Sequence, residues 1–128
     1  RTHAAVYELS GGRLGAWFGL PTLLLTFTGR KSGKRYSTPL VYFEDGGRYI
    51  VVGSDGAARR DPQWWKNLKA NPHGSVRVGR KQMDVVAHLA SGDERARLWE
   101  AGKSVNPMWA KYQTRTEREL PVVVLSPS

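Results

Sequence analysis

The loop from Gly29 to Arg35 carries a dense cluster of charge. Besides Arg35 it holds Arg30, Lys31 and Lys34, together with two glycines. Arginine makes forked contacts to phosphate or carboxylate, and lysine acts as a mobile point charge. Glycine lets the backbone approach a ligand, so that consecutive N–H groups can surround an anion. The residue order is not that of a Walker loop, so these residues indicate either an anion site of open identity or a solvated basic hairpin.

A second candidate for a binding site is the loop Ser54–Arg60, together with the helix expected after it. Its small residues leave room for a flat ring against the backbone. Asp61 and Pro62 predict a helix start, because Asp caps free N–H groups and Pro suits the first helical position. The positive end of that helix would lie near the loop. The alternative is an ordinary connection between a strand and a helix.

Two helical segments add aromatic and amide groups. Trp64 and Leu68 share an apolar face, whereas Asn67 is unusual in a helix interior and points either at a ligand or at water. Trp109 and Tyr112 lie three residues apart on one helical face. They either line an apolar substrate pocket or pack onto the sheet.

Several kinds of chemistry are excluded by composition. The chain has no cysteine, and its three histidines (His3, His73 and His88) lack metal-ligand spacing. No carboxylate pair or catalytic triad is visible. If the protein is an enzyme, a bound cofactor must carry the reaction.

The elements that position these groups are mostly short strands. Strands are predicted at residues 22–28, 37–44, 48–53, 75–78, 82–90 and 120–125, and helices at 4–9, 62–69, 91–101 and 107–115. Tight turns join several strands, which predicts a largely antiparallel sheet. A dinucleotide-binding glycine motif is lacking, and closure would remove exposed strand edges. The pattern therefore favours an α+β fold, a small closed or split β-barrel with peripheral helices, in one domain over residues 1–128, with residues 1–20 as an N-terminal helix and loop.

The formal net charge of +9 requires an anionic partner. Nucleic acid, an anionic surface and a phosphorylated, carboxylate-rich small molecule all satisfy that requirement. The chain shows no secretory signal and no apolar run long enough to span a bilayer, and the lack of cysteine suits a cytoplasmic protein. Because residue 1 is arginine, one open alternative is that the native N-terminus is trimmed and that a missing segment contacts a membrane.

Three blocks of sequence resemble the deazaflavin (coenzyme F420)-dependent nitroreductase family. The first is Leu23–Gly33 continued by Thr38–Tyr42, the second is Val51–Ala57 continued by Asp61–Pro72, and the third is Trp109–Thr116 continued by Leu120–Leu125. The blocks occur in the family's order and spacing, and together the resemblance covers about residues 7–125.

The resemblance implies a split β-barrel that binds reduced F420 and passes a hydride to quinones, nitro compounds or other electron-poor acceptors. It implies that the anionic tail of F420 is held by Arg30, Lys31, Ser32 and Gly33, with Arg35 as a substitute for a family arginine that would stand at Tyr36. The ring is expected beside Thr38, Pro39, Leu40 and Val41 and the loop residues Val52, Ser54, Asp55, Gly56 and Ala57, with Trp64 and Asn67 closing the site. The acceptor is expected against Trp109 and Tyr112, where Tyr112 or solvent supplies a proton.

The sequence departs from the family pattern at two further places. Asp55 stands where the family commonly has lysine, and Asn106 stands at the first of three tyrosine positions near the C-terminus. Two other hypotheses stay open beside reduction of an acceptor by reduced F420. One is a split barrel that binds FMN, haem or another cofactor, and the other is a non-enzymatic basic module for nucleic acid or an anionic membrane. Either a monomer or a homodimer is compatible with the sequence.

Overall fold

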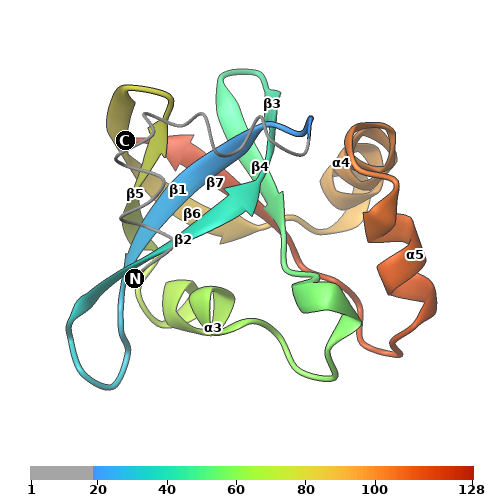
Figure 1. The fold of residues 1–128 in the computed structure, drawn as a ribbon, viewed down its shortest axis with the longest axis horizontal. Coiled ribbons are helices and arrows are strands. Elements are labelled where there is room, and N and C mark those ends of the chain that lie inside the picture. Colours follow the sequence, from blue (N-terminus) through green and yellow to red (C-terminus); the bar gives the residue numbers. More distant parts are fainter. Residues whose placement is uncertain (1–18) are drawn as a thin grey trace.

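The computed structural model describes residues 19–128, so the helix expected at residues 4–9 lies outside the described part. Seven strands form one sheet in the order β2-β1-β5-β6-β7-β4-β3, and every neighbouring pair is antiparallel (Figure 1). The strands are β1 (Thr22–Thr28), β2 (Arg35–Val41), β3 (Phe43–Asp45), β4 (Arg48–Val52), β5 (His73–Val78), β6 (Lys81–Leu89) and β7 (Val122–Pro127). β2 also contacts β4, so the sheet curls toward closure.

Three α-helices and one short turn of helix flank this sheet. They are η1 (Asp55–Ala57), α3 (Gln63–Ala70), α4 (Gly92–Val105) and α5 (Met108–Thr114). α3 lies under the concave side of the sheet, while α4 and α5 lie together beyond the β4 and β7 end (Figure 1). Between residues 19 and 128 no helix is long and apolar enough to cross a membrane.

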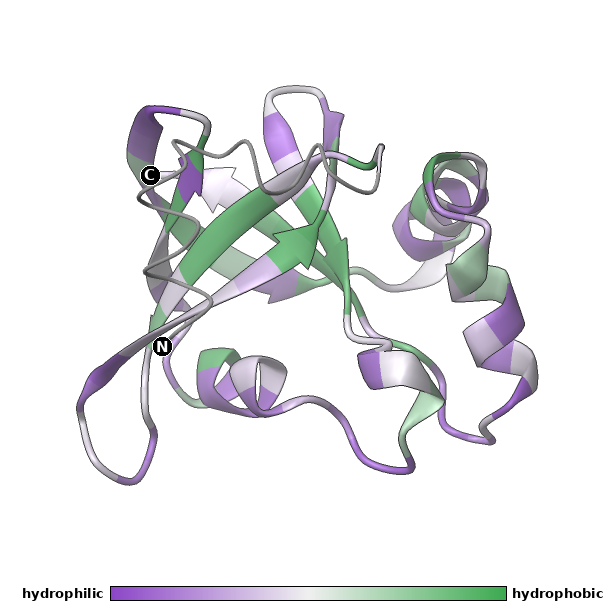
Figure 2. Ribbon diagram, in the orientation of Figure 1, coloured by the Kyte–Doolittle hydropathy of each residue, from purple (hydrophilic) through white to green (hydrophobic). Residues whose placement is uncertain are grey.

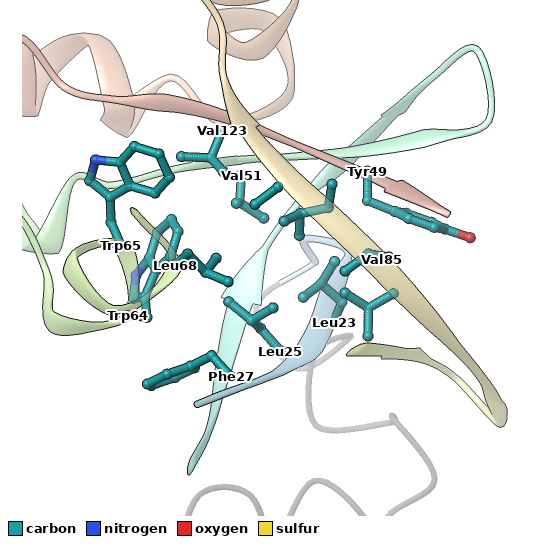
Figure 3. Close-up of a cluster of buried hydrophobic side chains, with 13 residues drawn as sticks. Leu23, Leu25, Phe27, Tyr49, Val51, Trp64, Trp65, Leu68, Val85 and Val123 are labelled. Atoms are coloured by element: carbon teal, nitrogen blue, oxygen red, sulfur yellow. The ribbon is translucent and has the colours of Figure 1, made fainter. Parts of the chain in front are cut away.

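The strands β4 and β7 are buried on both faces. Val51 and Val123 point into the curl, where Trp65 and Leu68 of α3 cover them (Figure 3). The alternate residues of the same strands join a second cluster with α4 and α5 that includes Phe43, Ile50, Val52, Leu98, Trp109, Leu120, Val122 and Val124. This explains the continuous apolar runs in these strands, because successive side chains of a strand point to opposite faces. Figure 2 shows that the most hydrophobic residues lie in the central strands, whereas many of the most hydrophilic residues lie in the turns and on the helices.

Several strand ends differ from the expected bounds by one or two residues, and three differences are larger or concern how the elements begin. The strand expected at residues 37–44 is divided at Tyr42, whose N–H donates to the carbonyl of Pro21 (3.1 Å). The helix expected to end near residue 101 continues to Val105. Ser91 and Glu94 have the Ser-x-x-Glu spacing of a capping box, which together with Asp61 predicts capped helix starts. Neither Asp61 nor Ser91 caps a helix with its side chain, and α3 begins at Gln63. The carboxylate of Asp61 is instead bound by another side chain, described below.

An ion-pair network joins the β3–β4 turn to α4. Asp45 accepts hydrogen bonds from Arg97 (2.7 Å) and Arg48 (2.8 Å), and Arg48 also donates to Glu94 (3.0 Å). Glu94 is also bound to His88 (2.9 Å). The hydrogen bonds from Arg97 and Arg48 lower the pKa of Asp45 to about 2. The network therefore ties the sheet edge to the helix that covers it, provided that Asp45 is ionised.

This network predicts a pH-dependent contribution to stability. The pKa of Asp45 is lower in the folded chain than in the unfolded chain, so its contribution is present above pH 4 and is lost as the pH falls toward 2. We expect Asp45→Asn to lower Tm by roughly 3–6 °C at pH 6 and by almost nothing near pH 2. Calorimetry across this range measures the difference. Glu44→Gln, on the same strand but outside the network, is the control, and an equal loss for both variants at pH 6 contradicts the role of Asp45.

Candidate functional site

Two cavities follow one another along β2 and α3. The basic cavity, of about 450 Å³, is lined by Phe27, Gly29, Arg30, Lys31, Ser32, Tyr36, Ser37, Gln63 and Asn67. The central cavity, of about 380 Å³, is lined by Thr38, Pro39, Leu40, Val41, Val52, Ser54, Asp55, Gly56, Pro62, Trp64, Asn106, Trp109 and Tyr112. Along β2, Ser37 ends the first lining and Thr38 begins the second. The two cavities are therefore consecutive compartments bounded by the same strand and helix.

The loop between β1 and β2 is closed by its own backbone. The N–H of Gly29 donates to the carbonyl of Lys34 (2.7 Å), and the N–H of Gly33 donates to the carbonyl of Gly29 (2.9 Å). A Cβ atom at Gly29 would lie 2.7 Å from Cε2 of Tyr36, so only glycine lets the tyrosine ring lie against the loop. Gly33 adopts a φ of +73°, which a side chain would strain. The two glycines thus shape the loop.

Arg30 fastens this loop to α3. Its backbone N–H and its Nη1 both donate to Oδ1 of Asn67 (2.9 Å each), and Nη1 also donates to Oε1 of Gln63 (3.1 Å). Asn67 is buried, which explains an asparagine in a helix interior: its carbonyl oxygen receives two donors from the basic loop. Lys31, Lys34 and Arg35 are exposed. The cations of the loop that do not bind α3 therefore face solvent.

The loop after β4 has an unusual backbone. Asp55, Gly56 and Ala57 have φ values of +42°, +61° and +68°, although two of them carry side chains. Such conformations cost on the order of 1–3 kcal/mol each and persist only where the surroundings hold them. Ser54 is right-handed and Asp55 left-handed, a sequence of conformations that turns successive N–H groups toward one concave point. The N–H groups of Asp55 and Gly56 find no acceptor in residues 19–128, and both residues line the central cavity.

Arg118 holds this loop in place. Its guanidinium donates to the carbonyl of Ala58 through Nε (2.7 Å) and to that of Gly53 through Nη1 (2.9 Å). Nη2 donates to the carbonyl of Ser54 (2.7 Å), and Nη1 also pairs with the carboxylate of Asp61 (3.0 Å). Only 14% of the side chain is exposed. One side chain from the segment between α5 and β7 thus binds both ends of the loop.

The helix α5 forms the opposite wall of the central cavity. Trp109 is buried and packs against Phe43, with ring centroids 6.2 Å apart. It also lies against Gly102 of α4, where a Cβ atom would meet its ring at 3.2 Å. Tyr112, one turn further along α5, is half-buried and lines the same cavity. The sequence left two alternatives for Trp109 and Tyr112, which were packing onto the sheet and lining a cavity. At Trp109 both occur together.

The structure brings most of the expected site residues together. Those in the central cavity are Thr38, Pro39, Leu40, Val41, Val52, Ser54, Asp55, Gly56, Trp64, Trp109 and Tyr112, and those in the basic cavity are Arg30, Lys31, Ser32 and Asn67. Gly33, Arg35 and Ala57 lie outside both linings, whereas Tyr36, at the position of the family arginine, lies in the basic cavity.

Sequence reasoning missed several contributors, among them Pro62, Gln63, Asn106 and Arg118. Gln63 and Pro62 could have been found from the expected start of α3, since the first helical turn faces the preceding loop. Asn106 was noticed only as a departure from a pattern. No local signal distinguishes Arg118 from the other 19 lysines and arginines, because its partners lie 57 to 65 positions away.

A curled antiparallel sheet with a basic and a central cavity defines a split-barrel cofactor-binding protein. A family model described as F420H(2)-dependent quinone reductase matches residues 1–127. The chain belongs to this family, which confirms the resemblance inferred from its sequence.

Relatives and solved structures agree with this assignment. The F420H(2)-dependent quinone reductase Rv1261c of Mycobacterium tuberculosis is 40% identical over 131 residues, which cover 98% of this chain and 88% of the relative. A solved F420-H2 dependent reductase, FDR-A, is 40% identical with a TM-score of 0.77 over 83% of this chain and 94% of its own. A solved domain-swapped dimer is 34% identical with a TM-score of 0.78 over 98% and 100% of the two chains. A FAD-binding protein of Mesorhizobium loti, 15% identical with a TM-score of 0.59 over 86% and 83%, shares the fold. The expected split-barrel fold is therefore confirmed.

Replacing Arg118 is expected to affect both stability and the loop. Arg118→Ala removes four hydrogen bonds and leaves Asp61 without its closest cation, so we expect unfolding to become easier by about 2–4 kcal/mol. Amide hydrogen exchange over residues 53–61 should accelerate, and F420 should bind at least about tenfold more weakly. Denaturant unfolding, exchange and F420 titration measure these effects.

Arg95→Ala is the matched control for this prediction. Arg95 is similarly buried, donates to the carbonyl of Leu120 (2.8 Å) and lies near Glu119, but does not touch the loop. This variant should also lose stability, while its F420 affinity stays unchanged. If both variants bind F420 as the parent does, the loop does not depend on Arg118 for cofactor binding.

Proposed function

We propose that the basic cavity and the central cavity together form the F420 groove of an F420H(2)-dependent quinone reductase. Family membership and about 40% identity over nearly the whole chain establish F420 as the cofactor and quinone reduction as the activity. The observation that carries the assignment of residues is the succession of the two cavities along β2 and α3. An elongated cofactor with an anionic tail and a flat ring requires such a pair of compartments.

The residues present fit both ends of this cofactor. The basic cavity offers the cations of Arg30 and Lys31 and the hydroxyl of Ser32, which suit phosphate and carboxylate groups. The central cavity offers two N–H groups, those of Asp55 and Gly56, which have no acceptor among residues 19–128, beside a strand whose side chains are half-buried. A Cβ atom at Gly56 would meet nothing within 4 Å, so this loop leaves open space for a ring.

Each compartment has a role in the reaction. Bound F420H2 supplies a hydride, which carries two electrons, to the acceptor. The N–H groups of Asp55 and Gly56 would bind a carbonyl oxygen at the edge of the ring and hold the ring in position for the transfer. Pro62 and Trp109 exclude water from the cavity. The hydroxyl of Tyr112, or solvent, delivers a proton to the reduced acceptor.

The tail assignment rests on Arg30, Lys31 and Ser32, and the ring assignment on β2 and the loop after β4. Asn67 contributes indirectly, because its Oδ1 accepts hydrogen bonds from Arg30 and so positions that side chain. Arg35 lies at the first position of β2, outside the basic cavity, so we assign it only long-range attraction of the anionic tail. Gly33 and Ala57 contribute through the positive φ angles that set the backbone conformations of their loops.

Nitroaromatic compounds are a second class of acceptor that this site supports. The wall formed by Trp109 and Tyr112 is aromatic and recognises flat, electron-poor rings through stacking rather than through a particular functional group. Turnover of a nitroaromatic compound beside a quinone, with the same preparation, tests whether the two classes share the site. Competitive inhibition between them supports a shared site.

Binding of F420 tests the tail assignment. We expect Lys31→Ala to weaken F420 binding about tenfold at low salt, with the difference shrinking as salt rises, because a charge contact to the tail is lost. Fluorescence titration with F420 measures the dissociation constant at each ionic strength. Lys31 makes no hydrogen bond that supports α3 among the contacts of residues 19–128, so its removal leaves the loop in place.

Lys81→Ala is the matched control, because Lys81 is also exposed, carries the same charge and lies at the start of β6 away from both cavities. Equal weakening by the two variants would show that net charge, rather than this loop, attracts F420. Reconstitution with FMN or haem in the same titration tests the alternative cofactors. Steep salt-dependent binding to DNA without F420 affinity would favour the basic binding module instead.

A further inference from the structure

Asn106 is a buried polar residue at the wall of the central cavity. It joins α4 to α5, and only 8% of the residue is exposed. Asn106 lines the cavity together with Trp109 and Tyr112, which stand on the helix that it precedes. Its side chain therefore lies on the side of the cavity assigned to the acceptor, opposite β2.

The hydrogen bonds of Asn106 use only part of its capacity. Its N–H donates to the carbonyl of Gly102 (2.8 Å), and its own carbonyl accepts from Trp109 (3.1 Å). In the side chain, Oδ1 accepts from the N–H of Met108 (3.1 Å), which fixes the orientation of the amide. The Nδ2 group has no acceptor in the described part of the chain and is not among the fully enclosed polar atoms. A donor held in a buried residue with access to a cavity is available to a ligand.

We propose that Nδ2 of Asn106 donates a hydrogen bond to a carbonyl oxygen of the quinone acceptor. This inference rests on the proposed function, since it assigns a group to the acceptor side of the same site. A carbonyl oxygen suits an N–H donor whose direction is already set by the bond from Met108 to Oδ1. The short, rigid link to α5 keeps this donor in a constant position relative to Trp109.

The reduction of a quinone builds charge that such a donor stabilises. A quinone becomes a hydroquinone by gaining one hydride and one proton, and the two electrons of the hydride are those lost by reduced F420. Negative charge builds on the carbonyl oxygen as the hydride arrives, and the proton then reaches that oxygen from Tyr112 or solvent. The amide of Asn106 stabilises the charge and keeps its own protons.

Asn106→Asp separates this role from a structural one. The aspartate retains an oxygen to accept from the N–H of Met108, but it replaces the NH2 donor by a second acceptor. Because the new carboxylate is buried, we expect Tm to fall by a few degrees. F420 affinity, measured below that Tm, should stay unchanged, while kcat/KM for 1,4-naphthoquinone falls about 10- to 100-fold. Steady-state kinetics, F420 titration and thermal unfolding of the F420-loaded protein measure the three quantities.

Asn71→Asp is the matched control. Asn71 also uses Oδ1 to accept a backbone N–H two residues ahead, that of His73 (3.2 Å), and it lies outside both cavities. The two variants make the same chemical change and the same change in net charge. We expect Asn71→Asp to reduce naphthoquinone at the parent rate.

A second measurement does not depend on turnover or on a variant that folds. In the protein loaded with oxidised F420, the side-chain amide signal of Asn106 in a ¹H–¹⁵N spectrum should shift on addition of 1,4-naphthoquinone. It should not shift with naphthalene, which has the same rings without carbonyl oxygens. Quinone turnover by Asn106→Asp at the parent rate, or an unmoved amide signal, overturns this inference while leaving the proposed function intact. Failure of the parent protein to bind F420 or reduce naphthoquinone overturns both.

Discussion

The burial of β4 and β7 on both faces is the constraint on which the rest of the structure depends. Strands with an unbroken run of valine, isoleucine and leucine expose apolar surface in two directions, and each direction needs cover. α3 covers the concave side, and α4 and α5 cover the other. Because α3 and α5 also form walls of the cavities, the packing of the core and the shape of the site have the same origin.

The loop after β4 lies at the junction of these two packed regions. It leaves the sheet at Gly53, passes through three residues with positive φ and enters α3. Such a backbone is unstable by itself, and Arg118 supplies the compensating hydrogen bonds from a distant part of the chain. The result is a loop fixed at both ends, in which the N–H groups of Asp55 and Gly56 have no acceptor within residues 19–128. A site that must hold a ring in position for the transfer benefits from this fixed backbone.

The excess of positive charge serves more than one purpose. Arg118 binds the loop after β4, Arg48 and Arg97 hold the β3–β4 turn to α4, and Arg30 both binds α3 and lines the basic cavity. Lys31 and its exposed neighbours in the β1–β2 loop remain for the anionic tail of the cofactor. A formal net charge of +9 therefore overstates the charge available for binding, because several of the arginines are structural.

The sequence by itself determined the strands, the turns, the family and most of the lining of the site. Apolar runs, glycine turns and blocks that resemble a family are local patterns, so β1 was predicted to the residue and most loop residues of both cavities were found. Local patterns failed where a side chain had two possible partners. Asp61 and the Ser91–Glu94 pair have the form of helix caps, but nearby arginines bind Asp61 and Glu94 instead.

Only the tertiary structure decided which polar groups are occupied and which are free. Arg118 joins the site through partners about 60 positions away in the sequence. Asn67 accepts a hydrogen bond from Arg30, which lies 37 positions before it. Asn106 shows the converse, since its Oδ1 is engaged locally while its Nδ2 opens on the cavity that the fold creates. Hydrogen bonds form between groups that are close in space, and closeness in space is set by how the sheet curls rather than by spacing along the chain.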